Sequence, residues 1–211
     1  MALLRYTLLS DGPADRALMP PITWCIAAHS PNLPIQAEFA DFRRLFKPPR
    51  GLTNRMLKAV DLYPCDVLFV HRDAENEPAQ NRVNEILAAA KELASDFQVP
   101  VVAVVTVRMQ EAWFLFNESA IRRASGNPNG KMEFDLPPLS KLEMVPDPKS
   151  MLHEALRTFS GLKGRRLKAF GASGHANRVA DLIDDFSPLR SLRAFRDFED
   201  RLKTVLEVSG V

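Results

Sequence analysis

The sequence has little of what marks several common protein classes. Its 211 residues include two cysteines, Cys25 and Cys65, and neither belongs to a C-x-x-C pair or a Cys/His cluster. A zinc finger or a disulfide-stapled scaffold is therefore not expected. The four histidines are scattered along the chain and no two of them are four residues apart, which argues against a metal site built on histidines.

Signatures of nucleotide and hydrolase chemistry are also missing. The chain contains no Walker A sequence, no G-x-G-x-x-G and no G-x-S-x-G, so nucleotide hydrolysis, dinucleotide redox chemistry and serine hydrolysis lack support. The triplet His71-Arg72-Asp73 matches a kinase catalytic loop, but no other kinase motif accompanies it. No apolar run approaches the ~18 residues of a membrane span, and residues 1–6 do not resemble a signal peptide. We therefore expect a cytoplasmic protein without membrane contact.

What the chain does contain is a composition typical of a globular domain. Hydrophobic residues make up 46% and charged residues 26% of the sequence, which leaves enough apolar side chains for a sizeable core. The net charge of +2 is too small to indicate a nucleic-acid binder by itself. We expect residues 1–211 to form a single α/β domain, with an insertion or irregular region at about residues 117–165.

Short apolar runs rich in β-branched residues predict the strands. Three clear runs and a weaker fourth cover residues 3–10, 66–70, 99–107 and 167–172. The second and third are apolar almost throughout, a pattern typical of strands buried on both faces of a parallel sheet. The sequence therefore predicts a small Rossmann-like α/β fold, with a mainly parallel sheet of about four strands flanked by helices.

Helical patterns and loops fill the intervals between these strands. We expect helices over residues 14–28, 53–63, 78–97 and 176–185, and a further helix that starts near Glu111. Prolines concentrate in residues 30–51 and 117–149, which we interpret as long ordered loops. The phenylalanines of the first loop, Phe46 included, are expected in the core.

Acidic side chains follow each of the first three predicted strands. Asp11 comes after the first strand, Asp73 and Glu75 after the second, and Glu111 after the third. Open α/β sheets bind ligands outside the carboxyl ends of their strands, so neighbouring strands would direct these carboxylates into one crevice. Carboxylates packed together repel unless a cation neutralises them, and a divalent ion with oxygen ligands is the usual solution. The pattern predicts a divalent-metal site.

Each carboxylate alone also has an ordinary explanation. Acidic residues are common in loops after strands, where they are solvated or cap the next helix. Glu111 precedes an apolar segment at residues 112–116 and could interact there with a helix dipole. Asp73 and Glu75 support the metal interpretation better, because two residues separated by one at the end of a strand can point to the same side.

Together these segments resemble the Toprim-like fold, in particular a compact Toprim-related family of uncharacterised proteins that is related to OLD-type nucleases and often found with phage-defence ATPases. The resemblance rests on four segments, in the order Asp11-Gly12, Asp73-x-Glu75, Glu111-Ala112-Trp113 and residues 186–195. It spans most of the chain in separated pieces. The sequence departs from the family at two acids, since Asp11 stands where glutamate is usual and Glu75 where aspartate is usual.

The resemblance implies phosphodiester cleavage assisted by Mg²⁺ or Mn²⁺, in a metal-dependent nuclease that belongs to an anti-phage defence system. Asp73, Glu75 and Glu111 would hold the metal, and Asp11 would be a further ligand or the general acid/base. Nucleic acid is the implied substrate. An ATPase partner subunit and a homo-oligomer are further expectations.

Basic residues offer candidate contacts to a nucleic-acid backbone. Arg43 and Arg44 lie in the first proline-rich loop, Lys168 lies in the fourth predicted strand, and His175 and Arg178 follow the glycine-containing turn after it. A solvated basic surface and an ordinary turn explain the same residues. For both clusters this simpler explanation is favoured.

Two other functions remain open. The chain could be a non-catalytic or partner-activated subunit that docks on an ATPase or another larger protein, with catalysis arising only in the complex. It could also be a small-molecule phosphohydrolase that uses the same acids, although it has no clear aspartyl nucleophile motif. A metal-dependent nuclease with a Toprim-like core is the leading hypothesis.

Overall fold

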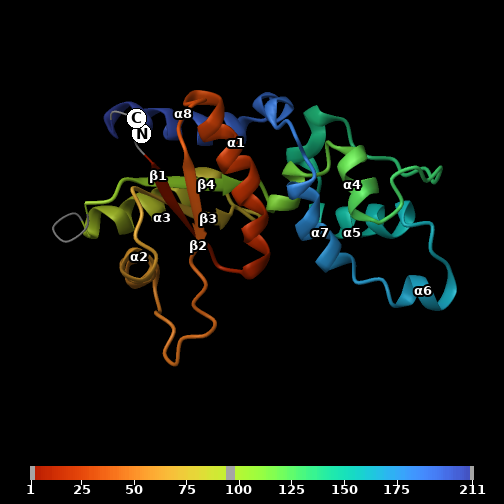
Figure 1. The fold of residues 1–211 in the computed structure, drawn as a ribbon, viewed down its shortest axis with the longest axis horizontal. Coiled ribbons are helices and arrows are strands. Elements are labelled where there is room, and N and C mark those ends of the chain that lie inside the picture. The colour runs from red at the N-terminus through yellow and green to blue at the C-terminus, as the bar shows by residue number, and fades with distance from the viewer. Residues whose placement is uncertain (1–2, 94–97, 210–211) are drawn as a thin grey trace. The chain divides into compact units, whose positions relative to one another are not determined.

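The computed structural model describes residues 3–93 and 98–209, and the chain divides into two compact units (Figure 1). Unit 1 consists of residues 1–105 and 197–211, and unit 2 consists of residues 106–196. Unit 2 is therefore inserted in the sequence of unit 1. That the chain forms a single domain with an irregular region at about 117–165 stays a prediction, because this division does not show that either unit folds alone.

Unit 1 is built on an all-parallel sheet with the strand order β2-β1-β3-β4. The strands are β1 (Leu4–Leu9), β2 (Ile35–Phe39), β3 (Val67–Asp73) and β4 (Val101–Thr106). The register pairs Tyr6 of β1 with Ala37 of β2 on one side and with Val67 of β3 on the other. The predicted α/β fold with a mainly parallel sheet flanked by helices is confirmed.

Three of the strands match predicted runs, but β2 lies in a segment that was expected to be a loop. Half-buried and exposed residues alternate along β2, as they do in an edge strand with one face on the core. The strand predicted at residues 167–172 is wrong, because α6 (Gly164–Lys168) and α7 (Ala172–Asp181) occupy this region. No residue of α6 is buried, so this basic segment lacks the apolar face that a sheet strand needs.

Helices cover both faces of the sheet (Figure 1). On one face lie α1 (Met19–His29) and the part of α8 (Arg193–Ser209) from residue 197 on. On the other face lie α2 (Leu52–Leu62) and α3 (Ala79–Glu92), which bury a core against the side chains of Leu68, Val70 and Val105. This placement follows from the β-α-β connections, which put successive crossover helices on opposite faces when the chain changes direction along the sheet.

Phe69 of β3 is central to the core on the α1 side. Its ring makes edge-to-face contacts with Tyr6 and Phe198, at centroid distances of 5.1 and 6.3 Å, and all three side chains are fully buried. The Tyr6 hydroxyl donates to the Met19 carbonyl oxygen at 3.1 Å and lies 2.7 Å from the Thr23 hydroxyl. Burial raises the pKa of Tyr6 well above its ordinary value, so this phenol stays neutral.

The helix boundaries differ from the predicted ones at several ends. The segment predicted as a helix at 14–28 begins as a 3-10 helix, η1 (Pro13–Leu18), and continues as α1. Pro20 and Pro21 fall in the first turn of α1, where the missing N–H groups have no intrahelical partner in any case. The helix predicted over residues 78–97 corresponds to α3, which ends at Glu92, and residues 94–97 lie outside the described residues.

Unit 2 is mainly helical. Besides α6 and α7 it contains η2 (Gln110–Trp113), α4 (Glu118–Ala124), η3 (Leu139–Met144), α5 (Pro148–Phe159) and η4 (Ser187–Ser191). α5 packs against α4, α7 and η2. The buried rings of Trp113 and Phe195 meet edge to face at 5.1 Å, so the two segments quoted from this unit for the resemblance share one core. Among the helices of residues 3–93 and 98–209, none is long and apolar enough to cross a membrane.

Replacing Phe69 with alanine should destabilise the protein strongly. The substitution leaves a cavity beside Tyr6 and Phe198, and truncating a buried phenylalanine costs about 3–5 kcal/mol. Urea unfolding should show this loss in the free energy of unfolding. Phe46→Ala is the control: Phe46 is 97% exposed, so its loss should change that free energy by less than about 0.5 kcal/mol. Equal effects of the two substitutions would contradict the packing described here.

Candidate metal centre

The strand order creates a switch point between β1 and β3. From β1 the chain moves through α1 to β2 on one side, and from β2 it passes through α2 to β3 on the other side of β1. Open α/β sheets bind ligands in the crevice outside the carboxyl ends of strands at such a point. Asp11 follows β1 and Asp73 is the last residue of β3, so two predicted site residues flank the switch point.

A cavity of about 120 Å³ lies at this switch point. Four carboxylates, two guanidiniums and one imidazole line it, from Asp11, Asp15, His71, Arg72, Asp73, Glu75 and Arg82. The structure therefore brings together three of the predicted site residues, Asp11, Asp73 and Glu75. The arrangement is more mixed in charge than the sequence suggested, because the basic groups come from the same strand and from α3.

Side-chain alternation along β3 decides which groups face each other. Phe69 packs on the α8 side of the sheet, so His71 and Asp73 point to that same side. Arg72 points to the opposite side, where its guanidinium forms an ion pair with Glu85 of α3. The end of one strand thus supplies the cavity with side chains from both faces of the sheet.

His71 is buried between two acceptors. Its Nδ1 donates to the Val104 carbonyl oxygen at 2.9 Å, and its Nε2 lies 3.4 Å from Asp73 Oδ1. Burial alone would lower the pKa of His71, but the hydrogen bond and charge of Asp73, with the charge of Asp15, outweigh it, and the pKa is raised. His71 therefore stays protonated to a higher pH than an ordinary histidine, and its Nε2 contact holds the Asp73 carboxylate at the rim of the cavity.

Asp11 is held by two arginines. Its carboxylate forms ion pairs with Arg55 of α2 and with Arg72, whose Nε lies 3.2 Å from Asp11 Oδ2. The β1–β3 register, continued past the end of β1, places Asp11 opposite Arg72. Arg55 also donates to the Ser10 carbonyl oxygen, which fixes the guanidinium beside the strand end. The Asp11 side chain is 52% exposed, so solvent and ligands reach it.

Glu75 has a left-handed backbone conformation, with φ of 53°. For a residue other than glycine this conformation costs roughly 1–2 kcal/mol. The turn at Glu75 comes two residues after the end of β3, and both Asp73 and Glu75 line the same cavity. The strained backbone at Glu75 thus positions a carboxylate that lines the cavity. Backbone strain of this kind is common at functional sites.

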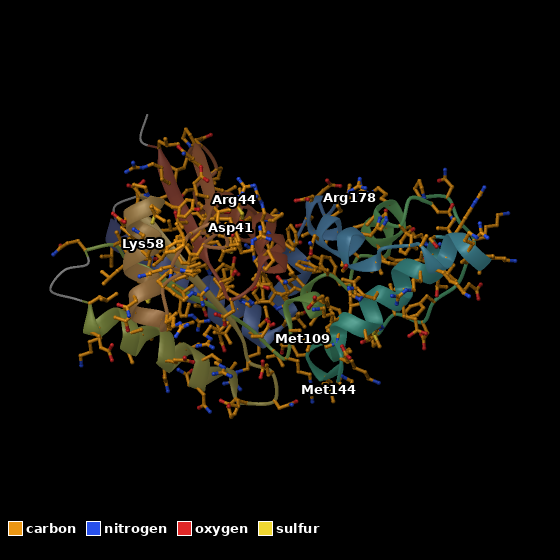
Figure 2. All side chains as sticks on the ribbon, turned by 90° about the horizontal axis from the view of Figure 1, so that it is seen from below. Asp41, Arg44, Lys58, Met109, Met144 and Arg178 are labelled. Carbon is orange, nitrogen blue, oxygen red and sulfur yellow. The ribbon has the colours of Figure 1, made fainter. Side chains whose placement is uncertain are left out.

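A second cavity of about 300 Å³ extends toward β2. Asp11 lines both cavities, and Arg55, its ion-pair partner, lines the second one. It is lined by Ser10, Asp11, Gly12, Pro13, Phe39, Ala40, Asp41, Phe42, Arg43, Pro48, Pro49 and Arg55. Hydrogen bonds from Arg43 hold the pKa of Asp41 well below its usual range. Figure 2 labels Asp41 and Arg44 on the segment that follows β2. This segment places the predicted basic residues Arg43 and Arg44 next to the carboxyl edge of the sheet.

Glu111, the fourth predicted carboxylate, belongs to unit 2. It lies on η2, a 3-10 helix of four residues, and is 8% exposed. The helix expected near Glu111 is therefore only one short turn. The role of Glu111 as a metal ligand stays a prediction.

The remaining predicted residues also lie in unit 2. His175 of α7 donates from Nδ1 to the Ala124 carbonyl oxygen at 2.7 Å and stacks on Phe170 at a centroid distance of 4.3 Å. These contacts give His175 a packing role between α4 and α7. Lys168 and Arg178 are exposed, and Figure 2 labels Arg178 on this unit. Nucleic-acid contacts by these three residues stay predictions.

Sequence reasoning missed Asp15 and His71. Asp15 lies in η1, and its Oδ2 accepts a hydrogen bond from the Gly12 amide at 2.9 Å. Its distance of four residues from Asp11 was a visible signal, because a single turn after Gly12 returns the chain toward the strand end. In the sequence alone, His71 belongs to a chance match to a kinase motif. Its burial and its hydrogen bond to the Val104 carbonyl oxygen depend on β4, so no local signal revealed them.

The donor chemistry of the acidic cavity suits a hard divalent cation. All its candidate anionic ligands are carboxylate oxygens. Its volume of about 120 Å³ is well above the ~10–15 Å³ that one water molecule needs, so an ion and bound water fit inside it. In the part of the chain that the structure describes, no three of these carboxylates have ligand atoms within 4.8 Å of one another. Because Asp11 and Asp73 are 52% and 31% exposed, side-chain rotation can bring them closer around an ion.

Comparison of the chain with family models, with curated proteins and with solved structures finds no match. The resemblance to the Toprim-like family therefore rests on the residues quoted for it, and the family stays a proposal.

Nuclear magnetic resonance titration of the metal-free protein should place the pKa of His71 above that of an ordinary histidine. Asp73→Asn should lower it, because the substitution removes the charge that offsets burial. Because the pKa of His71 is raised in the folded protein, the stability of the protein should also depend on pH. The stabilisation from protonated His71 is full below the ordinary imidazole pKa and is lost as pH rises through the raised one. An unchanged His71 pKa in Asp73→Asn would contradict the contact.

Replacing Glu75 with glycine should leave stability unchanged or raise it by up to about 1 kcal/mol, because glycine adopts a positive φ without strain. Glu77→Gly is the matched control. Glu77 is exposed in the same turn and has no positive φ, so its replacement should lower stability by about 0.5–1 kcal/mol. Chemical unfolding of both variants measures the difference. A clear loss of stability in Glu75→Gly would show that the carboxylate itself supports the fold.

Proposed function

We propose that the chain is a Mg²⁺- or Mn²⁺-dependent nuclease whose metal site is the acidic cavity between β1 and β3. The observation that carries this proposal is the convergence of four carboxylates on one cavity at the switch point of a parallel sheet. The Toprim-like resemblance supports the same chemistry independently of this geometry. It also supports a cytoplasmic role in anti-phage defence.

Asp73 and Glu75 would hold the ion, with Asp11 as a further ligand or the general acid/base. The bound ion would polarise the phosphate and lower the pKa of a water molecule. His71 Nε2 lies 3.4 Å from Asp73 Oδ1 and would support this carboxylate from the outer coordination sphere. Asp15 adds a fourth negative charge beside these groups.

The arginines around Asp11 suit a phosphodiester substrate. Arg55 and Arg72 now share the Asp11 carboxylate, and a guanidinium pairs with phosphate oxygens as well as with carboxylates. A phosphate that enters the cavity would take over one of these pairs, which releases the Asp11 carboxylate toward the ion. Arg55 and Arg72 would thus balance the negative charge of Asp11 before substrate binding and the negative charge of the phosphate after it.

The basic segment after β2 supports a nucleic-acid substrate. Arg43, Arg44, Lys47 and Arg50 are exposed there, and Arg43 lines the larger cavity that shares Asp11 with the acidic one. Phe46 was expected in the core, but that prediction is wrong: the ring is 97% exposed among these basic residues. Cationic side chains with an exposed aromatic ring are the usual contacts for a nucleic-acid strand.

Metal titration followed by thermal melting and by cleavage of single-stranded DNA, double-stranded DNA and RNA tests this proposal. Mn²⁺ or Mg²⁺ should raise the melting temperature, by the equivalent of about 2.7 kcal/mol at a hundredfold excess over the dissociation constant. Cleavage should require the ion and stop on chelation. Asp73→Asn should remove the metal shift and reduce cleavage by at least about 100-fold.

Asp66→Asn is the matched control. Asp66 directly precedes the same strand at its other end, where it pairs with Arg5, so the metal shift and cleavage should survive its loss. Full cleavage by Asp73→Asn would overturn the site. A folded protein with neither metal shift nor cleavage would favour the alternative, a subunit that docks on an ATPase partner or another large protein. Hydrolysis of small phosphate esters alone would favour a phosphohydrolase.

A further inference from the structure

A second group of metal-ligating side chains lies between α1 and α8, within unit 1. Cys25 and His29 are four residues apart on α1 and so share one face of that helix, and Glu199 faces them from α8. His29 Nε2 lies 2.8 Å from Glu199 Oε1, and Cys25 Sγ lies 3.7 Å from the same oxygen. In the described part of the chain this is the one group of three or more such residues whose ligand atoms all lie within 4.8 Å of one another.

The spacing of these atoms is close to that of a zinc site. Zinc bonds to sulfur, nitrogen and oxygen are about 2.0–2.3 Å long, so tetrahedral geometry puts ligand atoms about 3.3–3.5 Å apart. The Cys25–Glu199 distance of 3.7 Å needs almost no change. The His29–Glu199 distance of 2.8 Å must lengthen by about half an ångström to reach this spacing.

The burial of the group also fits a metal site with one open position. Cys25 is fully buried and Glu199 is 4% exposed, whereas the His29 side chain is 23% exposed. An ion bound here would replace the hydrogen bonds that Glu199 forms with His29 and Cys25 and would remain reachable from solvent along His29.

We propose that Cys25, His29 and Glu199 bind Zn²⁺, with water in the fourth position. Binding would displace the Cys25 thiol proton to solvent and would replace the hydrogen bond between His29 and Glu199 by two bonds to the ion. A thiolate and an imidazole favour Zn²⁺ and disfavour Mg²⁺. The site is independent of the proposed function, because α1 runs from the carboxyl edge of the sheet to the amino edge and its last residues lie away from the acidic cavity.

The consequence of this site would be structural. Cys25 and Glu199 are 174 positions apart in sequence, so the ion would cross-link the beginning of unit 1 to the helix that returns to it after unit 2. Closing so long a loop lowers the entropy of the unfolded chain, and a metal cross-link stabilises the folded state accordingly.

Co²⁺ substitution of the full chain provides the test, because a cysteine thiolate bound to Co²⁺ gives a charge-transfer absorption band. The purified chain should bind one equivalent of Co²⁺ with this band, and Zn²⁺ should displace it and raise the melting temperature. Mg²⁺ should not displace the bound Co²⁺ and should leave the band unchanged. Cys25→Ser should abolish the band and weaken Co²⁺ binding by at least about 100-fold.

Cys65→Ser is the matched control, since Cys65 is the other buried cysteine and packs on the opposite face of the sheet. It should retain the band, and Asp73→Asn should retain it too, which separates this site from the acidic cavity. His29→Gln guards against misfolding, because His29 is partly exposed at the end of α1; this variant should stay folded, by circular dichroism, and lose tight binding. A wild-type chain without the band, or a band that survives Cys25→Ser, would overturn the proposal.

Discussion

The parallel pairing of β1 with β3 is the interaction on which the fold and the acidic cavity both depend. It aligns Leu8 with Phe69 in the core and, continued beyond the end of β1, sets Asp11 opposite Arg72. A shift by one residue would turn every side chain of β3 to the other face of the sheet. Phe69 would then leave Tyr6, and Asp73 would leave His71. The buried core therefore enforces the arrangement of charges at the strand ends.

The sequence predicted strands best where both faces of the strand are buried. β3 and β4 are covered on both faces, so their continuous apolar runs identified them as parallel strands. β2 is an edge strand with polar residues at alternate positions, and because prolines and charged residues flank it, its sequence was interpreted as part of a loop. The strand predicted at 167–172 failed for the opposite reason. Leu167 and Phe170 gave the segment apolar character, but α6 has no buried residue and its basic side chains are exposed, so the segment has no face that could pack in a sheet.

The candidate site was only partly predictable for a related reason. The carboxylates of Asp73 and Glu75 follow from spacing at the end of one strand, which is local information. The hydrogen bond of His71 to the Val104 carbonyl group of the next strand is not local, because that contact spans 33 residues. The group of Cys25, His29 and Glu199 joins two distant helices. Cys25 and His29 lie one helical turn apart, and the sequence shows this spacing, but two ligands alone do not indicate a metal site. The third ligand, Glu199, comes from α8.

The insertion of unit 2 within unit 1 also determines the order in which the protein can be completed during synthesis. Residues 1–105 carry the whole sheet except its last residue, but the helix that covers Phe69 comes from residues after 196. The ribosome must therefore synthesise all of unit 2 before α8 can pack beside α1 on this face of the sheet. During that interval the rings of Tyr6 and Phe69 have no partner from α8, and a chaperone or a neighbouring nascent chain has access to this apolar face.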